Sequence, residues 1–223
     1  TRFKCDWSSD VCSSDLSNTA FAIGTGDFTI EAFVYHVDSS AYSGYYWGNA
    51  SGLVLRRTNA NKLEISQDGV ASILISTATI PSNQWVHVAA TRSGTTVRLF
   101  INGTLDSSVT SSANFVSSGA ATVGSISTVA GYYMYGSISN LRIVKGQALY
   151  TSTFTPSTSP LTTTSQGATA SNVSLLTCQS STFIDNSTNN FTLTVNGNAI
   201  PIPTSPFTDP GYSSTAITTY GST

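Results

Sequence analysis

The sequence predicts an all-β domain, a sandwich or a barrel, and three observations lead to this fold class. Short runs rich in Ile, Val, Phe and Tyr alternate with turns of Gly, Asn, Ser and Pro from Phe21 onward. No stretch of ten or more residues has the 3.6-residue apolar period of an amphipathic helix. Apolar residues make up 39% of the chain and charged residues only 9%, which suits a packed core better than a disordered chain.

The first clear strand is expected over residues 27–37, DFTIEAFVYHV. Side chains alternate between the two faces of a strand, so Phe28, Ile30, Ala32 and Val34 share one face. Further strands are expected at 53–56, 62–65, 70–76 and 84–91, with a turn at 58–61.

Residues 95–106 give the strongest hairpin signal in the chain. The pair Asn102-Gly103 suits a two-residue type I′ turn, because both positions of that turn need a positive φ. Two more strands are expected at 121–126 and 133–144.

The C-terminal third contains fewer strand signals. Residues 146–150 could form one helical turn at most, and 155–172 are rich in Thr, Ser and Pro, which favours a surface crossing or a linker. Two strands are expected at 174–178 and 190–197, and the chain beyond Pro201 has little to bury.

Residues 6–16 read DWSSDVCSSDL, and this string resembles one reading frame of a common sequencing adapter. We therefore expect residues 1–16 to be a non-native segment that adds nothing to the sandwich; the alternative is a genuine polar arm. Without Cys5 and Cys12 only Cys178 remains, so no intrachain disulfide is predicted.

Three segments together resemble the concanavalin A-like lectin/glucanase superfamily, in its laminin-G-like branch. They are GTGDFTIEAFVY from Gly24, QWVHVAATR from Gln84 with VRLFING from Val97, and GSISNLRIVKGQALY from Gly136. The third segment is similar to phage and environmental examples. The resemblance implies an antiparallel two-sheet jelly-roll sandwich, and it indicates fold more than function, because this fold hosts many functions.

The resemblance suggests boundaries within the chain. Residues 17–155 are expected to form the jelly roll, N-terminally truncated, 156–172 a crossing or linker, and 201–223 a tail. Residues 173–200 either supply strands to the same sandwich or begin a second copy, and the chain is expected to belong to a longer multi-domain protein.

The sequence lacks the features that would indicate several classes of function. The net charge is −2 and no basic patch exceeds Arg56-Arg57, which argues against nucleic acid, and no apolar run is long enough to insert in a membrane. Neither His36 nor His87 has metal-ligand spacing. Glu31 is expected on the outer face as a structural residue, and no strand is expected to carry two carboxylates at i, i+2 or i, i+4. Catalysis is therefore not predicted, and neither is a cofactor.

Calcium is the metal that the resemblance suggests, since laminin-G-like domains sometimes bind it at the sandwich rim. Asp27 and Asp185, the latter in DNSTNN, are the available oxygen clusters. Hard cations prefer several carboxylates and each cluster offers one, so an Asx-rich turn is the alternative.

Aromatic clusters are the best indication of a ligand. Tyr45, Tyr46 and Trp47 form one cluster, and Tyr132 and Tyr133 form another. Sugar rings pack their C–H faces on such side chains, whose OH or NH also makes hydrogen bonds. The alternative is that these residues pack in the core or at its rim.

The function expected from these observations is a non-catalytic binding or adhesion module, a lectin that recognises glycan on a virion or an extracellular surface. Two alternatives are a structural decoration domain that mediates protein contacts and, less favoured, a glycoside hydrolase.

Overall fold

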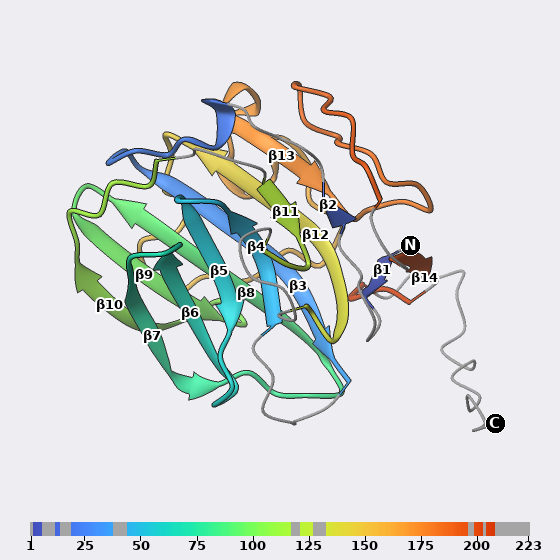
Figure 1. The fold of residues 1–223 in the computed structure, drawn as a ribbon, viewed down its shortest axis with the longest axis horizontal. Helices are drawn as coiled ribbons and strands as arrows, with labels where there is room; N and C mark the ends of the chain where they lie inside the picture. Colours follow the sequence, from blue (N-terminus) through green and yellow to red (C-terminus); the bar gives the residue numbers. More distant parts are fainter. Residues whose placement is uncertain are drawn as a thin grey trace.

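The computed structural model describes residues 2–5, 12–13, 19–37, 44–116, 121–126, 133–195, 199–202 and 204–207. Its strands form two antiparallel sheets that pack face to face (Figure 1). Helix in the described residues is limited to three 3-10 turns, η1 (Thr19–Phe21), η2 (Ser165–Gly167) and η3 (Ala170–Asn172), and none could cross a membrane. The expected all-β, two-sheet sandwich is confirmed.

The larger sheet has eight strands, and β3 (Phe28–His36) and β12 (Gly136–Lys145) lie at its centre. Its path is β10 (Thr104–Thr110), β9 (Thr96–Ile101), β8 (Trp85–Ser93), β3, β12, β1 (Arg2–Cys5) and β14 (Ile200–Ile202), and β13 (Val173–Thr177) also pairs with β12.

The smaller sheet has six strands and faces the viewer in Figure 1. Its order is β2 (Cys12–Ser13), β11 (Ala121–Val123), β4 (Gly44–Asn49), β5 (Leu53–Arg57), β6 (Lys62–Gln67) and β7 (Ala71–Thr79). At one side of the sandwich, the Asp106 carboxylate of β10 accepts hydrogen bonds from the backbone N–H groups of Thr77 and Ala78 on β7, at 2.6 and 2.8 Å. A charged side chain thus joins the edges of the two sheets.

The core lies between the sheets. Phe28, Ile30, Ala32 and Val34 of β3 point into it, as the alternation predicts, and all four are fully buried. The facing sheet contributes Tyr46, Trp47, Leu53, Leu55, Leu63 and Ile65. Burial of this apolar surface is the main favourable contribution to folding.

The hairpin turn at Asn102-Gly103 is confirmed. The φ angles of the two residues are +49° and +76°, and Thr104 pairs with Ile101 across the turn. Positive φ at both positions is the geometry of a type I′ turn. Gly103 is needed for a second reason, because a Cβ there would lie 2.1 Å from the carbonyl oxygen of Phe154.

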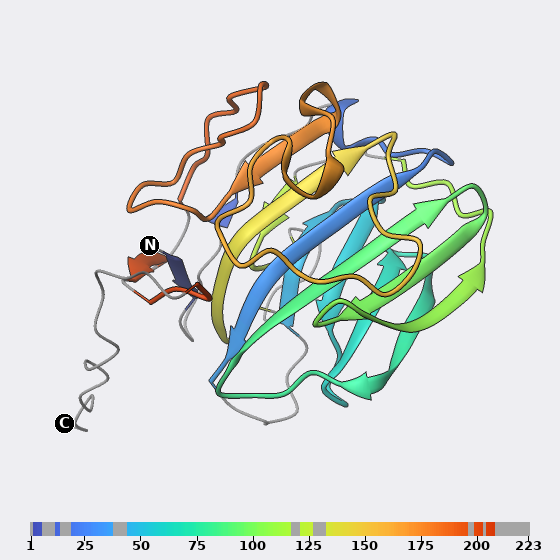
Figure 2. The same ribbon diagram turned by 180° about the vertical axis from the view of Figure 1, so that it is seen from behind.

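Residues 146–172, here called the crossing segment, run over the outer face of the eight-stranded sheet (Figure 2). They are a surface crossing rather than a free linker. Leu149 N donates to Thr29 Oγ1 at 2.8 Å, and Phe154 N donates to Gly103 O at 2.9 Å. Residues 146–150, where the sequence allowed one helical turn at most, form no helix.

The segment after the crossing returns to the same sheet. In β13, Leu175 pairs with Ile143 of β12, so this strand lies in the first sandwich, one of the two arrangements that the sequence left open. The strand expected at 190–197 was wrong for its described part, 190–195, which makes one isolated bridge, between Thr192 and Ile184. Asp185 accepts a hydrogen bond from Phe191 N there, so a local turn replaces sheet pairing.

The N-terminal residues pair with the sheets. Phe3 of β1 is opposite Ile138 of β12, and Cys12 of β2 is opposite Val123 of β11. This differs from the expectation that residues 1–16 add no strand. The physical reason is that an open strand edge offers N–H and C=O groups that can pair with a backbone of almost any sequence. The adapter origin of residues 6–16 stays a prediction.

Candidate functional site

A row of side chains crosses four strands on the outer face of the six-stranded sheet. The register places Tyr45 of β4 opposite Arg56 of β5, Arg56 opposite Glu64 of β6, and Glu64 opposite Ile75 of β7. Because side chains of directly opposed residues point to the same side of a sheet, the four form one continuous row. We call it the Arg56 row.

Arg56 is held in place by its two neighbours. Its Nε donates to Glu64 Oε2 at 2.9 Å, its Nη2 lies 2.8 Å from the same oxygen, and its Nη1 donates to Tyr45 Oη at 3.2 Å. The guanidinium carbon lies 5.5 Å from the centre of the Tyr45 ring, within the range of a cation–π contact.

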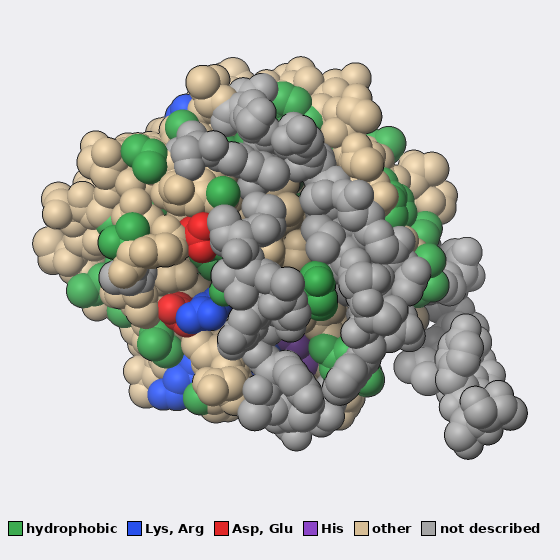
Figure 3. All heavy atoms as spheres, viewed as in Figure 1, with side chains coloured by type: hydrophobic (Ala, Val, Ile, Leu, Met, Phe, Trp, Pro, Cys, Tyr) green, Lys and Arg blue, Asp and Glu red, His purple; other side chains and the backbone are tan. Residues whose placement is uncertain are grey.

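The Arg56 row reaches solvent at Arg56 and Ile75. The Arg56 side chain is 26% exposed and Ile75 is 44% exposed, whereas Glu64 and Tyr45 are buried. Tyr45 packs with Val54 and Ile126 in a small apolar cluster separate from the core. In Figure 3, which views this face, a basic and an acidic side chain lie side by side near its centre. The row therefore places an exposed cationic hydrogen-bond donor and an exposed apolar side chain on the same sheet face, with Glu64 between them.

The electrostatics of the Arg56 row are mixed. Burial raises the pKa of Tyr45, and the charges of Asp68 and Glu64 raise it further, while Arg56 lowers it. Asp68 lies four residues after Glu64 but beyond the end of β6, so the strand itself carries one carboxylate of the two. The two carboxylates have separate partners: Asp68 Oδ2 accepts from Ser51 N at 3.2 Å, and Glu64 pairs with Arg56.

The structure separates the predicted aromatic residues. Tyr46 and Trp47 lie in the core, Trp47 with its ring centre 5.0 Å from that of Phe21. Of the predicted ligand-binding residues that the structure describes, Tyr45 alone joins the Arg56 row. Tyr133 is half-buried, and Tyr132 lies outside the described residues. Ligand contact by these residues stays a prediction.

Tyr46 is part of a buried polar group at one end of the core. Its hydroxyl lies 2.8 Å from His36 Nε2, and Arg57 Nη1 lies 3.5 Å from His36 Nδ1. Burial and the charge of Arg57 lower the pKa of His36 to about 3, so the imidazole is neutral near pH 7. Burial also raises the pKa of Tyr46 above its usual range.

A second polar cluster lies beneath the crossing segment, and sequence reasoning missed it. Glu31 Oε1 accepts from Arg142 Nε at 2.9 Å, and Glu31 Oε2 accepts from Tyr150 Oη at 2.8 Å and lies 3.0 Å from His87 Nε2. All four side chains are buried. Burial alone would raise the pKa of Glu31, but His87 and Arg142 outweigh it and hold the pKa below its usual range.

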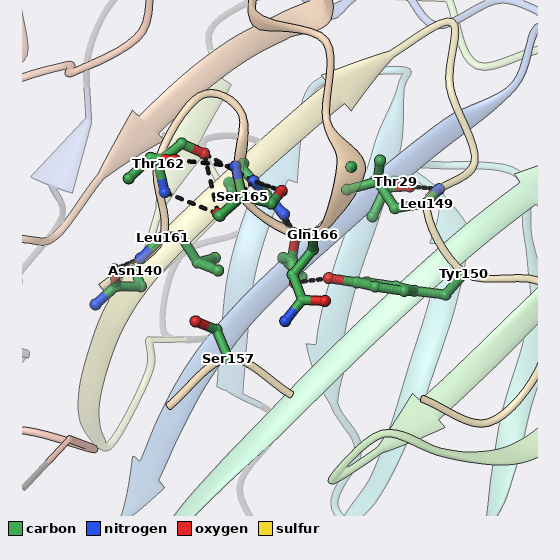
Figure 4. A network of polar contacts seen from close by, with 12 residues as sticks. Thr29, Asn140, Leu149, Tyr150, Ser157, Leu161, Thr162, Ser165 and Gln166 are labelled. Carbon is green, nitrogen blue, oxygen red and sulfur yellow. Dashed lines mark hydrogen bonds and ion pairs between the residues drawn. The ribbon is translucent and has the colours of Figure 1, made fainter. Parts of the chain in front are cut away.

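The crossing segment closes this Glu31 cluster. Arg142 Nη1 donates to the carbonyl oxygens of Thr162 and Ser165 at 2.7 and 2.9 Å, and Leu161 N donates to Asn140 Oδ1 at 2.8 Å (Figure 4). Tyr150 and Phe154 stack with ring centres 3.5 Å apart. Glu31 was expected on the outer face of its strand, and it does lie on the face of β3 that points away from the core. The crossing segment covers that face, so the side chain is buried. The cluster holds this segment down and offers no open site.

The calcium candidates show different environments. The Asp185 carboxylate accepts from Leu176 N, Ser187 N, Ser187 Oγ and Phe191 N, which fits an Asx turn and leaves little capacity for a cation. Asp27 Oδ1 accepts from Gly94 N at 2.8 Å. No group of three His, Cys, Asp or Glu side chains suited to a metal occurs among the described residues. Calcium at Asp27 stays a prediction.

The chain matches one family model, described as the concanavalin A-like lectin/glucanases superfamily, over residues 9–153. A comparison with curated protein sequences gave no match.

Similar solved structures share the fold at low identity. A protein of Bacteroides ovatus, described as a candidate carbohydrate-binding protein, is 16% identical with a TM-score of 0.60, over 88% of this chain and 58% of that one. A heptameric SAP-like pentraxin of Limulus polyphemus is 11% identical with a TM-score of 0.55, over 89% and 93%. A leech intramolecular trans-sialidase is 16% identical with a TM-score of 0.50, over 68% and 26%.

Proposed function

Because the chain belongs to the concanavalin A-like lectin/glucanases superfamily, we propose that it is a non-catalytic module that binds carbohydrate at the Arg56 row. The observation that carries this proposal is the exposure of both Arg56 and Ile75 in one row on this sheet face, on either side of Glu64. A sugar presents hydroxyl groups around its edge and apolar C–H faces, so its site needs hydrogen-bond donors next to apolar side chains.

The Bacteroides protein, described as a candidate carbohydrate-binding protein, adds support for this function class. This chain spans 58% of that protein, so the proposal concerns the module and its sugar site. Display of this module on a virion or an extracellular surface is part of the same proposal.

The carboxylates favour binding over hydrolysis. Glycoside hydrolases need one carboxyl group with a raised pKa as the acid and a second as nucleophile or base. Glu31 has the opposite shift and lies beneath the crossing segment, and Glu64 is held in an ion pair with Arg56. Neither arrangement suits an acid that must give up and regain a proton during turnover.

The expected affinity is weak for a single site. A shallow site that buries little surface binds with a Kd on the order of millimolar to high micromolar. Salt should have little effect, because a neutral sugar provides no opposite charge to screen. Several copies on one appendage would raise the apparent affinity by avidity.

A glycan array tests the proposal, with the wild-type chain displayed in multivalent form. We expect binding to at least one class of glycan, and we expect Arg56→Ala to abolish it. The matched control is Arg98→Ala, which removes a partly exposed arginine from β9 in the other sheet. Incubation of the bound glycans followed by product analysis should find no cleavage.

Two results would contradict the proposal. Equal binding by wild type and a folded Arg56→Ala variant would remove the Arg56 row from the site. Release of cleaved sugar that stops in Glu64→Gln would make the chain an enzyme.

A further inference from the structure

The Arg56 row also points to a class of sugar, an inference that rests on the proposed function. Arg56 carries five N–H donors on its guanidinium group. Nε donates to Glu64, Nη1 donates to Tyr45, and Nη2 forms the ion pair with the same Glu64 oxygen. Within the described part of the chain, one N–H on Nη1 and at least one N–H on Nη2 have no hydrogen-bond partner. Two parallel donors from one guanidinium suit two neighbouring oxygen atoms.

Neighbouring oxygens occur in two sugar chemistries, a pair of adjacent hydroxyl groups or a carboxylate. The charges around Arg56 distinguish them. Glu64 Oε2 lies 2.8 Å from Arg56 Nη2 and already compensates its positive charge. A sugar carboxylate at the free N–H groups would therefore lie close to the Glu64 carboxylate, and the two negative charges would repel each other.

The surrounding charges add nothing that would attract an anion. The outer face of β6, which also carries the Arg56 side chain on the neighbouring strand, has charged residues at even-numbered positions. They are Lys62, Glu64 and, just past the end of the strand, Asp68. Lys62 and Arg56 together balance Glu64 and Asp68. The negative charge of Asp68 also reaches the Arg56 row, since it raises the pKa of Tyr45. The net charge of these four groups is zero, and Glu64 is the one nearest to Arg56.

We propose that the Arg56 row binds neutral sugars through a pair of adjacent hydroxyl groups, and that Glu64 makes it discriminate against sugars that carry a carboxylate. Arg56 supplies the two donors and Ile75 supplies an apolar surface for the C–H face of the ring. Glu64 acts through Arg56: it orients the guanidinium group and cancels its charge. This makes Glu64 a residue that determines specificity by repulsion as well as by positioning.

The test compares matched pairs of immobilised glycans, galactose with galacturonic acid and lactose with sialyllactose. We expect the wild-type chain to bind the neutral member roughly tenfold more tightly, as expected for two like charges near a solvent-exposed site. Glu64→Gln keeps the shape and an acceptor for Arg56 but removes the charge. It should therefore reduce the ratio of neutral-glycan affinity to acidic-glycan affinity. Asp27→Asn makes the same change in net charge away from the Arg56 row and should leave the ratio unchanged.

Arg56→Lys provides a second variant if Glu64→Gln does not fold. It keeps the positive charge but loses the paired donors, so we expect it to lose affinity for the neutral glycans.

The outcomes separate the two proposals. Preference of the wild-type chain for the acidic glycans, weakening as salt is added, would overturn the discrimination by Glu64 and leave carbohydrate binding intact. An unchanged neutral-to-acidic ratio in a folded Glu64→Gln variant would also overturn it. Absence of binding to every glycan, with a folded wild-type chain, would overturn the proposed function itself.

Discussion

The Nη2 atom of Arg142 lies 2.5 Å from Oε1 of Glu31, and both side chains are fully buried. Glu31 belongs to β3 and Arg142 to β12, so the ion pair joins the two central strands of the larger sheet beneath the crossing segment. With Tyr150 and His87 it forms a buried polar network, in which His87 Nδ1 has no hydrogen-bond partner. Such a network holds its parts in one arrangement, and the loss of one member leaves the others buried without a partner.

Glu31→Gln should destabilise the fold by about 3 kcal/mol, because removing one charge of a buried ion pair leaves the other uncompensated. Urea denaturation at pH 7 measures this loss. Asp27→Asn is the control: its carboxylate is partly exposed and an Asn oxygen can still accept from Gly94 N, so its effect should be below about 1 kcal/mol. Equal effects of the two substitutions would show that the Glu31 cluster contributes no special stability.

His36 should make the fold sensitive to mildly acidic pH. Below pH 6.5 the unfolded chain takes up a proton on this histidine, whereas the folded chain does so only near pH 3. The free energy of unfolding therefore falls as the pH falls through this window, by about 1.4 kcal/mol per pH unit.

Urea midpoints at pH 8, 6 and 5 test this dependence in the wild type and in His36→Gln. The variant should be less stable at pH 8 but should lose less stability between pH 8 and pH 5. The Glu31 carboxylate has its ordinary pKa of 4.5 in the unfolded chain, and its contribution is lost only below that value. Parallel pH curves for the two proteins above pH 5 would exclude His36 as the source.

Gly103→Val should cost about 3 kcal/mol or more. A β-branched residue is strained at a φ of +76°, and its Cβ would lie 2.1 Å from Phe154 O. Gly94→Ala separates the two causes, because Gly94 also has a positive φ, +58°, but no atom lies within 4 Å of an added Cβ. We expect about 1 kcal/mol from Gly94→Ala. Thermal or urea unfolding gives both values, and similar losses would mean that the contact with Phe154 is unimportant.

Much of the fold could be predicted because its signals are local. The alternation of Phe28, Ile30, Ala32 and Val34 and the turn at Asn102-Gly103 each depend on a few adjacent residues. The strand expected at 190–197 failed because apolar alternation does not report hydrogen bonds to a side chain such as Asp185. The pairing of Arg2–Cys5 was also missed, since backbone pairing at an open strand edge leaves little trace in the side chains.

The candidate site was predicted less well, for reasons that depend on long-range contacts. The pairing between β4 and β5 shifts by one residue between Tyr45 and Trp47, so Tyr46 and Trp47 both enter the core and only Tyr45 faces outward. A bulge of this kind breaks the alternation that sequence reasoning uses. Glu31 meets Arg142 and Tyr150 across 111 and 119 residues, and no local pattern connects them.

The most direct test of the central claim is a nuclear magnetic resonance titration of the wild-type chain with a neutral glycan that it binds. The account predicts that the Nε–H signal of Arg56 and the backbone signals of residues 54–56 and 63–65 shift most, and that they saturate together. Largest shifts in the crossing segment, residues 146–172, with the Arg56 signal unchanged, would contradict it and place the sugar on the other sheet.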